Sequence, residues 1–450
     1  MTNKNNCVWN DPYSSFSQLN MGDAFFKNLL VRIINSFSKP IRTRYDGHES
    51  VEFPIVTFFN ALVGNSQNAG TNILNRKLKS IFGIESSEPS EVGRIIPHPS
   101  QIRNYSTRFS MEEVNETFSV LSQEILLHLF EQGAIPKQIK MAFDFHKELY
   151  YGKEKTPYIH GIKPENGTSK AFIWHTCCLI LKGRGLQIGS MMVKRGDDTG
   201  VFIKKMIEFL ESLGFVIELT AMDKEYYQKD IFKYLDKKEI RYIVPVRESK
   251  KLRKMKEAAL RNPKKRVQTY AMRDKYVKGK GYTHHKFKAA FYGKKGLNFG
   301  RLRAQYRKNK RPLGEILKDI FVLATNSLIT SPSLEKKYYF YKTRKEYGSR
   351  WIIETSYRDC NPFLMYTTSK DPNVRNLYFI VSLLLYDLWV LANLLLHKTQ
   401  YWKAKEPKVF FKEDLKNTLV VALEYFLKSG KWSKTFCRTK EIKAKRCILI

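Results

Sequence analysis

The chain is poor in acidic residues relative to basic ones. It has 43 Asp and Glu against 79 Lys and Arg, and its formal net charge of +36 is spread over 450 residues. This imbalance indicates a polyanionic partner. Nucleic acid fits best, because neutralising many phosphates releases counterions and gives strong, salt-sensitive binding. An anionic membrane surface and a ribosomal contact remain alternatives.

Cysteine is also scarce. The six cysteines form no CxxC pair and no Cys/His spacing typical of zinc sites. We therefore expect reduced thiols in a cytoplasmic protein. The first residues, MTNKNNCVWNDPYSS, lack the charged-then-apolar layout of a signal peptide, so no export is expected. With 43% hydrophobic residues the chain can bury a core without disulfides.

One apolar run is long enough to suggest a membrane span, LYFIVSLLLYDLWVLANLLLH at 377–397. It contains Asp387 and Asn393, which are costly in lipid unless they have partners. We interpret the run as a buried helix that closes a soluble core, with no membrane partner. A membrane anchor is the alternative.

The first 135 residues are predicted to form a helical DNA-binding region. SMEEVNETFSVLSQEILLHLF has helical periodicity and opens with a capping box, Ser110 with Glu113. Before it, Pro99-Ser100 starts a short helix that carries Arg103 and Arg108. A basic helix followed by a capped one fits a helix-turn-helix DNA reader, and fits equally an ordinary helical bundle with a solvated basic face.

After Ile139 the periodicity changes from helix to strand. Three strands, a helix, a strand, a helix and a strand predict a mixed α/β sheet flanked by helices, in the order of a ribonuclease-H-like core. A basic stretch rich in Tyr and Phe then predicts an inserted antiparallel β subdomain whose last strand is LNFGRLRAQYRKN. The predicted domains are 1–135, the core's first part at 136–246, the insertion at 247–317, the core's second part at 318–400, and a basic C-terminal region at 401–450.

Three acids stand at informative places in this pattern. Asp144 lies in the first predicted core strand, Asp223 ends the fourth, and Glu354 lies on the helix after the insertion. The first and fourth strands of such a sheet are neighbours, which brings Asp144 and Asp223 together. Clustered carboxylates bind Mg²⁺, and two such cations can drive in-line cleavage of a phosphodiester. Without metal, the acids would repel one another.

Glu354 also has an ordinary explanation. In YGSRWIIETSYRD, helical spacing puts Tyr347, Arg350 and Glu354 on one face, where Arg350 and Glu354 can form a surface i,i+4 pair. The apolar run Trp351-Ile352-Ile353 is expected to hold this helix against the sheet. Among neighbouring polar residues, His146 is expected to be structural or to approach the acids. Glu148, Glu225 and Glu346 are expected to be solvated.

These residues resemble a known family, the DDE transposases of insertion sequences in the branch numbered four. Its signature is Tyr, two residues, Arg, three residues, Glu, six residues, Lys, and Tyr347, Arg350 and Glu354 match the first three positions. The strand ending TAMD at Asp223 and FDFHK around Asp144 match the two aspartate sites. The likeness spans about residues 95 to 400 and includes the insertion.

The resemblance implies a transposase that cleaves and joins the DNA ends of its element. Asp144, Asp223 and Glu354 would be the catalytic metal ligands for two Mg²⁺ ions, which Mn²⁺ can replace. Tyr347 and Arg350 would hold the terminal phosphate. The partners would be double-stranded DNA, both terminal repeats and target, bound by a dimer in the cytoplasm at the nucleoid.

The sequence departs from this family at two points. Asn361 stands where the signature has Lys, and Arg358 is the candidate to take over that phosphate contact. After Asp223 the family has a residue, Gly and an aromatic, whereas this chain has Lys224-Glu225-Tyr226. A catalytically decayed, transposase-derived DNA-binding protein is therefore the alternative from another class. A stand-alone nuclease, which makes no joined product, is the enzyme alternative.

Overall fold

The structure is a computed structural model that describes residues 24–39, 52–62, 66–81, 97–277, 281–294, 297–329, 337–400, 412–413, 415–417 and 419. The chain divides into two compact units, described separately here: 1–134 with 152–154 and 358–450, and 135–151 with 155–357. Apart from the six residues just given, the predicted basic C-terminal region lies outside the described residues.

The first unit is helical in its described part. Its helices are α2 (Ala24–Ser36), α3 (Glu52–Leu62), α4 (Gln67–Ile81), α5 (Pro99–Ser106), α6 (Met111–Glu131) and α14 (Pro372–Gln400). The predicted capping box is confirmed, since Ser110 Oγ accepts from the Glu113 amide at 3.1 Å and Glu113 Oε2 from the Ser110 amide at 2.9 Å. The short helix at Pro99 is also confirmed. Arg103 and Arg108 are exposed, as both interpretations of this region require.

Helix α14 contains the long apolar run. Within the described residues, Pro372–Leu395 is the one stretch long and apolar enough to cross a membrane, and 94% of its most apolar window is buried in the structure. This is weak evidence for a span, because a buried core helix has the same length and composition. Helix α14 packs against α6, α3 and α5. The predicted domain limits stay predictions, while compactness groups α14 with the N-terminal helices.

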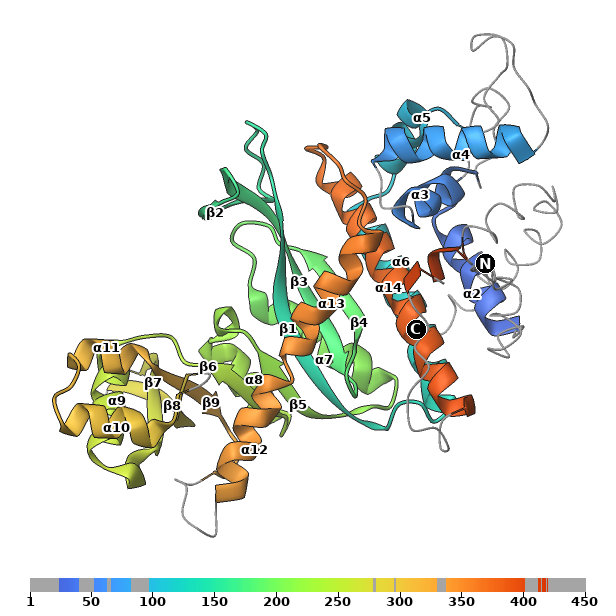
Figure 1. Cartoon of the computed structure of the whole chain (residues 1–450). Helices are drawn as coiled ribbons and strands as arrows, with labels where there is room; N and C mark the ends of the chain where they lie inside the picture. The colour runs from blue at the N-terminus through green and yellow to red at the C-terminus, as the bar shows by residue number, and fades with distance from the viewer. Residues whose placement is uncertain are drawn as a thin grey trace, which may run out of the picture. The chain divides into compact units, whose positions relative to one another are not determined.

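The second unit is built on a nine-stranded sheet (Figure 1). Its strands follow the order β2-β3-β1-β5-β6-β9-β8-β7, with β4 also paired to β3. Strands β3 and β4 run antiparallel to their neighbours, whereas β5 and β6 run parallel to β1. The order β4-β3-β1-β5-β6 is consistent with a ribonuclease-H-like fold. The strand bounds are β1 (Gln138–Leu149), β2 (Ile159–Glu165), β3 (Thr168–Ile180), β4 (Gly185–Met192), β5 (Val216–Met222), β6 (Arg241–Pro245), β7 (Val267–Val277), β8 (Gly281–Gly293) and β9 (Ile320–Thr325).

Helices cover both faces of this sheet. Phe143 of β1 packs edge-on against Phe202 of α7 (Thr199–Ser212), with ring centroids 6.1 Å apart. The preceding residue, Ala142, packs against Ile353 of α13 (Trp351–Cys360). Since successive side chains of a strand point to opposite faces, α7 and α13 lie on opposite sides of β1. Asp144, two residues after Ala142, is on the α13 side.

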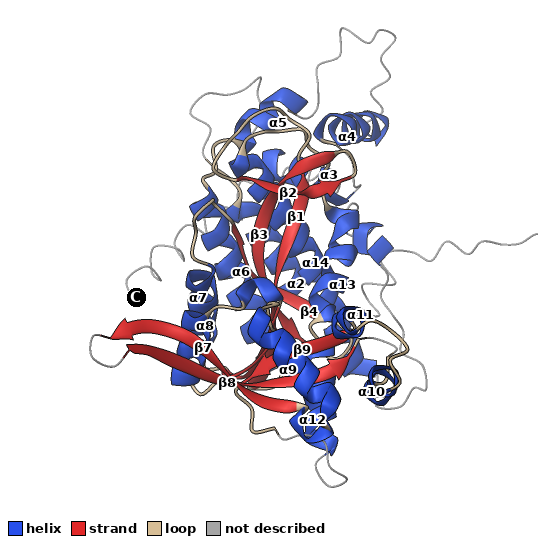
Figure 2. Cartoon of the chain, turned by 90° about the vertical axis from the view of Figure 1, so that its left-hand side faces the viewer, coloured by secondary structure: helices blue, strands red, loops and turns tan. Residues whose placement is uncertain are grey.

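The insertion differs from its prediction after the β7–β8 hairpin. It contains α9 (Lys250–Arg261), the short 3-10 helix η2 (Pro263–Lys265), the hairpin β7–β8, α10 (Phe299–Arg307) and α11 (Leu313–Lys318). The predicted strand at 297–309 is wrong, because Asn298 caps a helix there and Phe299 and Leu302 bury one helical face. Strand β8 pairs with β9, so the hairpin extends the main sheet (Figure 2).

Candidate active site

The pairing of β1 with β5 brings the first two acids together. In the parallel register Phe143 lies opposite Met222, and the Asp223 amide donates to the Phe143 carbonyl at 3.3 Å. Asp144 and Asp223 each follow this pair, so they lie beside each other at the ends of the paired segments, as predicted. Asp223 also begins the short 3-10 helix η1 (Lys224–Tyr226), which its side chain does not cap, so its carboxylate oxygens stay available.

Glu354 comes from a broken helix. The predicted continuous helix through Tyr347, Arg350 and Glu354 is wrong, since α12 (Lys337–Gly348) ends before Arg350 and α13 begins at Trp351. In the turn, the Arg350 amide donates to the Tyr347 carbonyl at 3.0 Å, and the Ile353 amide to the Arg350 carbonyl at 3.0 Å. These i to i+3 bonds tighten the chain between the two helices.

Helix α13 is held against β1, β3 and β4. Ile353 is fully buried against Ala142 and Cys178, and the buried Ser356 hydroxyl accepts from Gln187 Nε2 of β4 at 2.6 Å. At Gly185 a Cβ atom would lie 2.9 Å from Ile352 Cγ2, so only glycine allows this approach. Trp351, expected to pack on the sheet, is 64% exposed, because it starts the helix and points away from Ile353.

Arg350 connects two of the acids. Its guanidinium donates to Asp144 Oδ2 at 2.6 Å and to Glu354 Oε1, and the residue is 9% exposed. Burial acts to lower the pKa of Arg350, but Asp144, Tyr347 and Glu354 raise it well above its usual value. Arg350 is therefore a permanent cation inside the acid cluster. A bidentate-capable guanidinium suits this role better than an ammonium would.

The Asp144 carboxylate is buried beside one cation and two other acids. Its Oδ1 accepts from the Phe145 amide at 2.9 Å, and only 8% of the residue is exposed. The pKa of Asp144 is raised to about 6, because burial, helped by the charges of Asp223 and Glu354, outweighs the lowering by Arg350 and by the Phe145 amide. Asp223 and Glu354 are thus each within electrostatic reach of Asp144, and Asp144 is largely ionised at pH 7.

The other residues of the resemblance take different places. Tyr347 packs against Phe321, with centroids 5.6 Å apart, and lies beside Arg350; burial raises its pKa to about 12. Arg358 is exposed one turn after Glu354. His146 packs against Tyr357 at 4.9 Å between ring centroids, and burial lowers its pKa to about 4. A neutral, packed His146 favours the structural interpretation.

Glu346, expected to be solvated, is buried. It is 8% exposed, its Oε2 accepts from Arg241 of β6 at 2.7 Å, and its Oε1 lies 3.5 Å from Lys140 Nζ of β1. Both cations also pair with Glu218 of β5. This four-charge network fixes α12, and hence the approach to Arg350, on the sheet. Its cations come from strands about 100 to 200 positions away, so local sequence could not reveal it.

Sequence reasoning also missed a set of hydroxyl groups beside Asp144: Tyr226, Thr176 and Tyr357. Each is within hydrogen-bonding distance of the Asp144 carbonyl or of another member. The signal that could have found two of them is spacing. Tyr226 follows Asp223 by three residues, and Tyr357 follows Glu354 by three residues.

The acids fit a hard divalent cation in ligand type. Oxygen ligands are those that Mg²⁺ prefers, and all three side chains are carboxylates. No group of three or more His, Cys, Asp or Glu side chains within the described ranges is arranged to hold a metal ion. Arg350 instead pairs with both Asp144 and Glu354. The guanidinium supplies there the positive charge that a metal would supply.

Comparisons with known proteins give little further guidance. No protein-family model matches the chain, and no curated protein matches it. Among solved structures, the chain is similar to a piggyBac transposase in a synaptic complex with hairpin DNA, determined by cryo-EM. The match has 11% sequence identity and a TM-score of 0.46, and covers 96% of this chain and 84% of that chain. At so low an identity and TM-score, the likeness carries no inference about activity.

Proposed function

We propose that this chain is a DDE transposase that cleaves and transfers the DNA ends of an insertion sequence. The observation that supports it best is that Asp144 and Asp223 lie side by side on adjacent strands and that Arg350 links Asp144 to Glu354. Three acids gathered on adjacent elements are costly unless they bind cations. The test is metal-dependent cleavage of duplex DNA from the flanks of the chain's own gene, leaving 3′-hydroxyl ends.

In this proposal Asp144, Asp223 and Glu354 hold two Mg²⁺ ions, and Mn²⁺ can substitute. Bound metal supplies activation of the attacking oxygen and stabilisation of the leaving 3′-oxygen. Arg350 pairs with Asp144 and Glu354 and offsets their negative charge. Tyr347, Arg350 and Arg358 are the proposed contacts to the terminal DNA phosphates. Joining two DNA ends requires a dimer on DNA, acting in the cytoplasm at the nucleoid.

A second candidate is a transposase-derived DNA-binding protein that has lost catalysis. Two observations favour it. Arg350 already pairs with two of the three acids, and Asn361 replaces the signature Lys. Such a protein would bind DNA with the same salt sensitivity but would cut it neither with Mg²⁺ nor with Mn²⁺.

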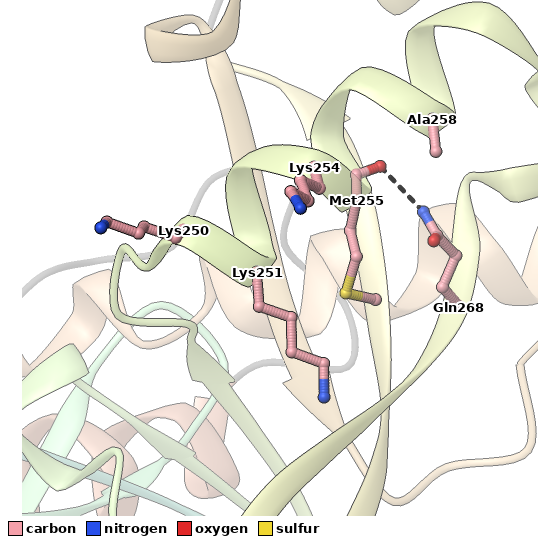
Figure 3. Close-up of a pocket in the computed structure, with 6 residues that line it drawn as sticks. All are labelled: Lys250, Lys251, Lys254, Met255, Ala258 and Gln268. Carbon is pink, nitrogen blue, oxygen red and sulfur yellow. Dashed lines mark hydrogen bonds between the residues drawn. The ribbon is translucent and has the colours of Figure 1, made fainter.

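We assign part of the DNA-binding surface to the insertion. Its helix α9 and strand β7 border an open depression of about 420 Å³, lined by Lys250, Lys251, Lys254, Met255, Ala258 and Gln268 (Figure 3). Gln268 Nε2 donates to the Met255 carbonyl at 3.0 Å and fixes the depression's wall. The three lysines are exposed. This surface carries none of the three acids, so its proposed role is to hold phosphates and not to cut.

Replacing Lys250, Lys251 and Lys254 together with glutamine is expected to weaken DNA binding about tenfold or more at 0.15 M salt. Each lost phosphate contact removes about 0.9 from the slope of log affinity against log salt, so the slope should fall by up to about 3. The measurement is a fluorescence-anisotropy titration of a labelled duplex at several salt concentrations.

The matched control is the triple substitution of Lys163, Lys182 and Lys237 with glutamine. These lysines are equally exposed but scattered over β2, the β3–β4 turn and α8 (Lys229–Lys237). They change the net charge by the same amount. Equal losses in both triple variants would show that total charge, and not the α9 surface, determines the affinity.

A further inference from the structure

The backbone carbonyl of Asp144 accepts hydrogen bonds from two side chains. Tyr226 Oη donates to it at 3.2 Å, and Thr176 Oγ1 donates to it at 3.3 Å. The Thr176 hydroxyl in turn is hydrogen-bonded to Tyr357 Oη. Tyr226 and Thr176 are fully buried. Two buried hydroxyls from different elements thus converge on one peptide group of the acid-bearing strand.

The direction of each bond follows from the available protons. Burial raises the pKa of Tyr226 and of Tyr357 well above the usual value, so both hydroxyls keep their protons. Because Thr176 gives its single proton to the carbonyl, Tyr357 must donate to Thr176. Likewise Tyr226 gives its proton to the carbonyl, and His175 Nδ1, 3.1 Å away, donates to the Tyr226 oxygen.

His175 completes this arrangement as a neutral donor. It is fully buried, and burial lowers its pKa to about 4. With the proton on Nδ1, the buried Nε2, which has no hydrogen-bond partner in the structure, is an unprotonated nitrogen. Leaving such a nitrogen unpaired costs less than leaving an N–H unpaired.

The hydroxyls reach the Asp144 carbonyl from both faces of the sheet. Tyr226 stacks on Phe145, with centroids 4.9 Å apart, and reaches the carbonyl from the α7 side. Thr176 lies opposite Asp144 in the β1–β3 register and meets Tyr357 on the α13 side. A strand carbonyl lies near the sheet plane, so it can be reached from either face.

The donors also belong to the elements that carry the other two acids. Tyr226 is the last residue of η1. The Tyr226 amide donates to the Asp223 carbonyl at 3.1 Å and closes the turn. Tyr357 is three residues after Glu354 on α13, and residues three apart share a helix face. One peptide group of β1 is therefore tied to the neighbour of Asp223 and to the neighbour of Glu354.

We propose that Tyr226, Thr176 and Tyr357 are positioning residues that fix the three acids relative to one another through the Asp144 carbonyl. The inference rests on the proposed function, since it concerns the same acids. Removing one of these hydroxyls keeps all three acids in the sequence. It lets the strand or helix that carries an acid shift relative to the others. An ångström-scale shift of one ligand weakens a metal site and slows the reaction.

The experiment measures Mn²⁺ binding to the full-length protein without DNA, by electron paramagnetic resonance of the unbound ion. Tyr226→Phe and Thr176→Val are each expected to raise the Kd for Mn²⁺ about tenfold, the effect of one buried hydrogen bond. Thr176→Ser keeps the hydroxyl and should restore the wild-type Kd. In the double variant Tyr226→Phe/Thr176→Val, the Kd for Mn²⁺ should rise by less than the product of the two single fold-increases, because both hydroxyls bind the same carbonyl.

Tyr292→Phe is the matched control. Tyr292 is 2% exposed and donates to a backbone carbonyl, that of Phe340, at 2.9 Å. Its ring stacks on Phe340 of α12, with centroids 4.3 Å apart, and its hydroxyl is not hydrogen-bonded to the Asp144 carbonyl, so its substitution should lower stability similarly and leave Mn²⁺ binding unchanged. Equal shifts in Tyr226→Phe and Tyr292→Phe, or no shift in either, would overturn the inference. If Tyr226→Phe does not fold, the comparison of Thr176→Val with Thr176→Ser decides.

Asp144→Asn separates this inference from the proposed function. If wild type binds Mn²⁺ and Asp144→Asn does not, the acids hold metal, and a wild-type Kd in Tyr226→Phe and Thr176→Val refutes only the positioning role. If Asp144→Asn binds Mn²⁺ as wild type does, the proposed metal site is wrong, and the positioning role is wrong with it.

Discussion

Replacing Arg350 with methionine is expected to lower the free energy of unfolding of the sheet unit by about 3–5 kcal/mol at pH 7. Methionine fills a similar volume but carries no charge. Asp144, which is 8% exposed, would lose its partner 2.6 Å away; it would either stay charged without compensation or take up a proton, and both cost free energy. Breaking a buried ion pair on one side is more costly than removing both partners, because the remaining charge is neither solvated nor compensated.

The loss should shrink as the pH falls. Burial already raises the pKa of Asp144 to about 6, and loss of Arg350 removes the main opposing effect. A carboxyl whose folded-state pKa exceeds its unfolded one binds more protons when folded, so its cost falls as the pH drops below the folded pKa. The variant should therefore recover part of its stability between pH 7 and pH 5.

Hydrogen–deuterium exchange of β1 and β3 peptides over a urea series, in EDTA, measures this free energy. Arg358→Met is the control, because Arg358 is exposed on α13, eight residues after Arg350, and its loss should change stability by less than about 0.5 kcal/mol. A loss below about 1 kcal/mol in Arg350→Met, or one independent of pH, would contradict the buried pairing of Arg350 with Asp144.

Replacing Asp223 with asparagine is expected to slow DNA cleavage about a thousandfold or more while leaving DNA affinity within about twofold. Removing one metal ligand sacrifices several kcal/mol of transition-state stabilisation, and each 1.36 kcal/mol is a factor of ten in rate. Stability should be unchanged or slightly higher, because Asp223 raises the pKa of Asp144 by charge repulsion. Single-turnover cleavage and anisotropy titrations of the same duplex give both quantities.

Asp230→Asn is the matched control for this substitution. Asp230 lies seven residues later on α8, and its side chain is 78% exposed. The Asp230→Asn variant should cleave DNA at the wild-type rate. If Asp223→Asn weakened binding and cleavage in parallel, Asp223 would belong to the DNA-binding surface. If wild type and variant both bound DNA without cutting it, the decayed DNA-binding protein would be the correct interpretation.

Hydrophobic periodicity in the sequence predicted most strands of the sheet. The core strands β1, β3, β4, β5, β6 and β9 could be predicted because each alternates or buries apolar residues between clear turn signals. Gly183, with φ of +80°, lies in the turn between β3 and β4, and Gly214, with φ of +82°, follows the end of α7; both conformations favour glycine. Strand β2 escaped prediction, because only Ile159 of its seven residues is buried.

The site was partly predictable, for a physical reason. Asp144 and Asp223 follow from strand order, since a parallel pairing fixes which residues become neighbours. The burial of Glu346 depends on Lys140 and Arg241, which reach α12 from β1 and β6. The hydroxyls around the Asp144 carbonyl depend likewise on tertiary register. Contacts between distant segments leave no periodic trace in the sequence.

The most direct test of the proposed function compares wild type with Glu354→Gln on a duplex from the DNA flanking the gene, in Mg²⁺, Mn²⁺ or EDTA. Glu315→Gln, at an exposed acid on α11, is the control. The proposal predicts 3′-end cleavage by wild type and control that requires metal and is lost in Glu354→Gln. Cleavage by Glu354→Gln at the wild-type rate, or salt-sensitive binding without cleavage by any of the three proteins, would contradict it.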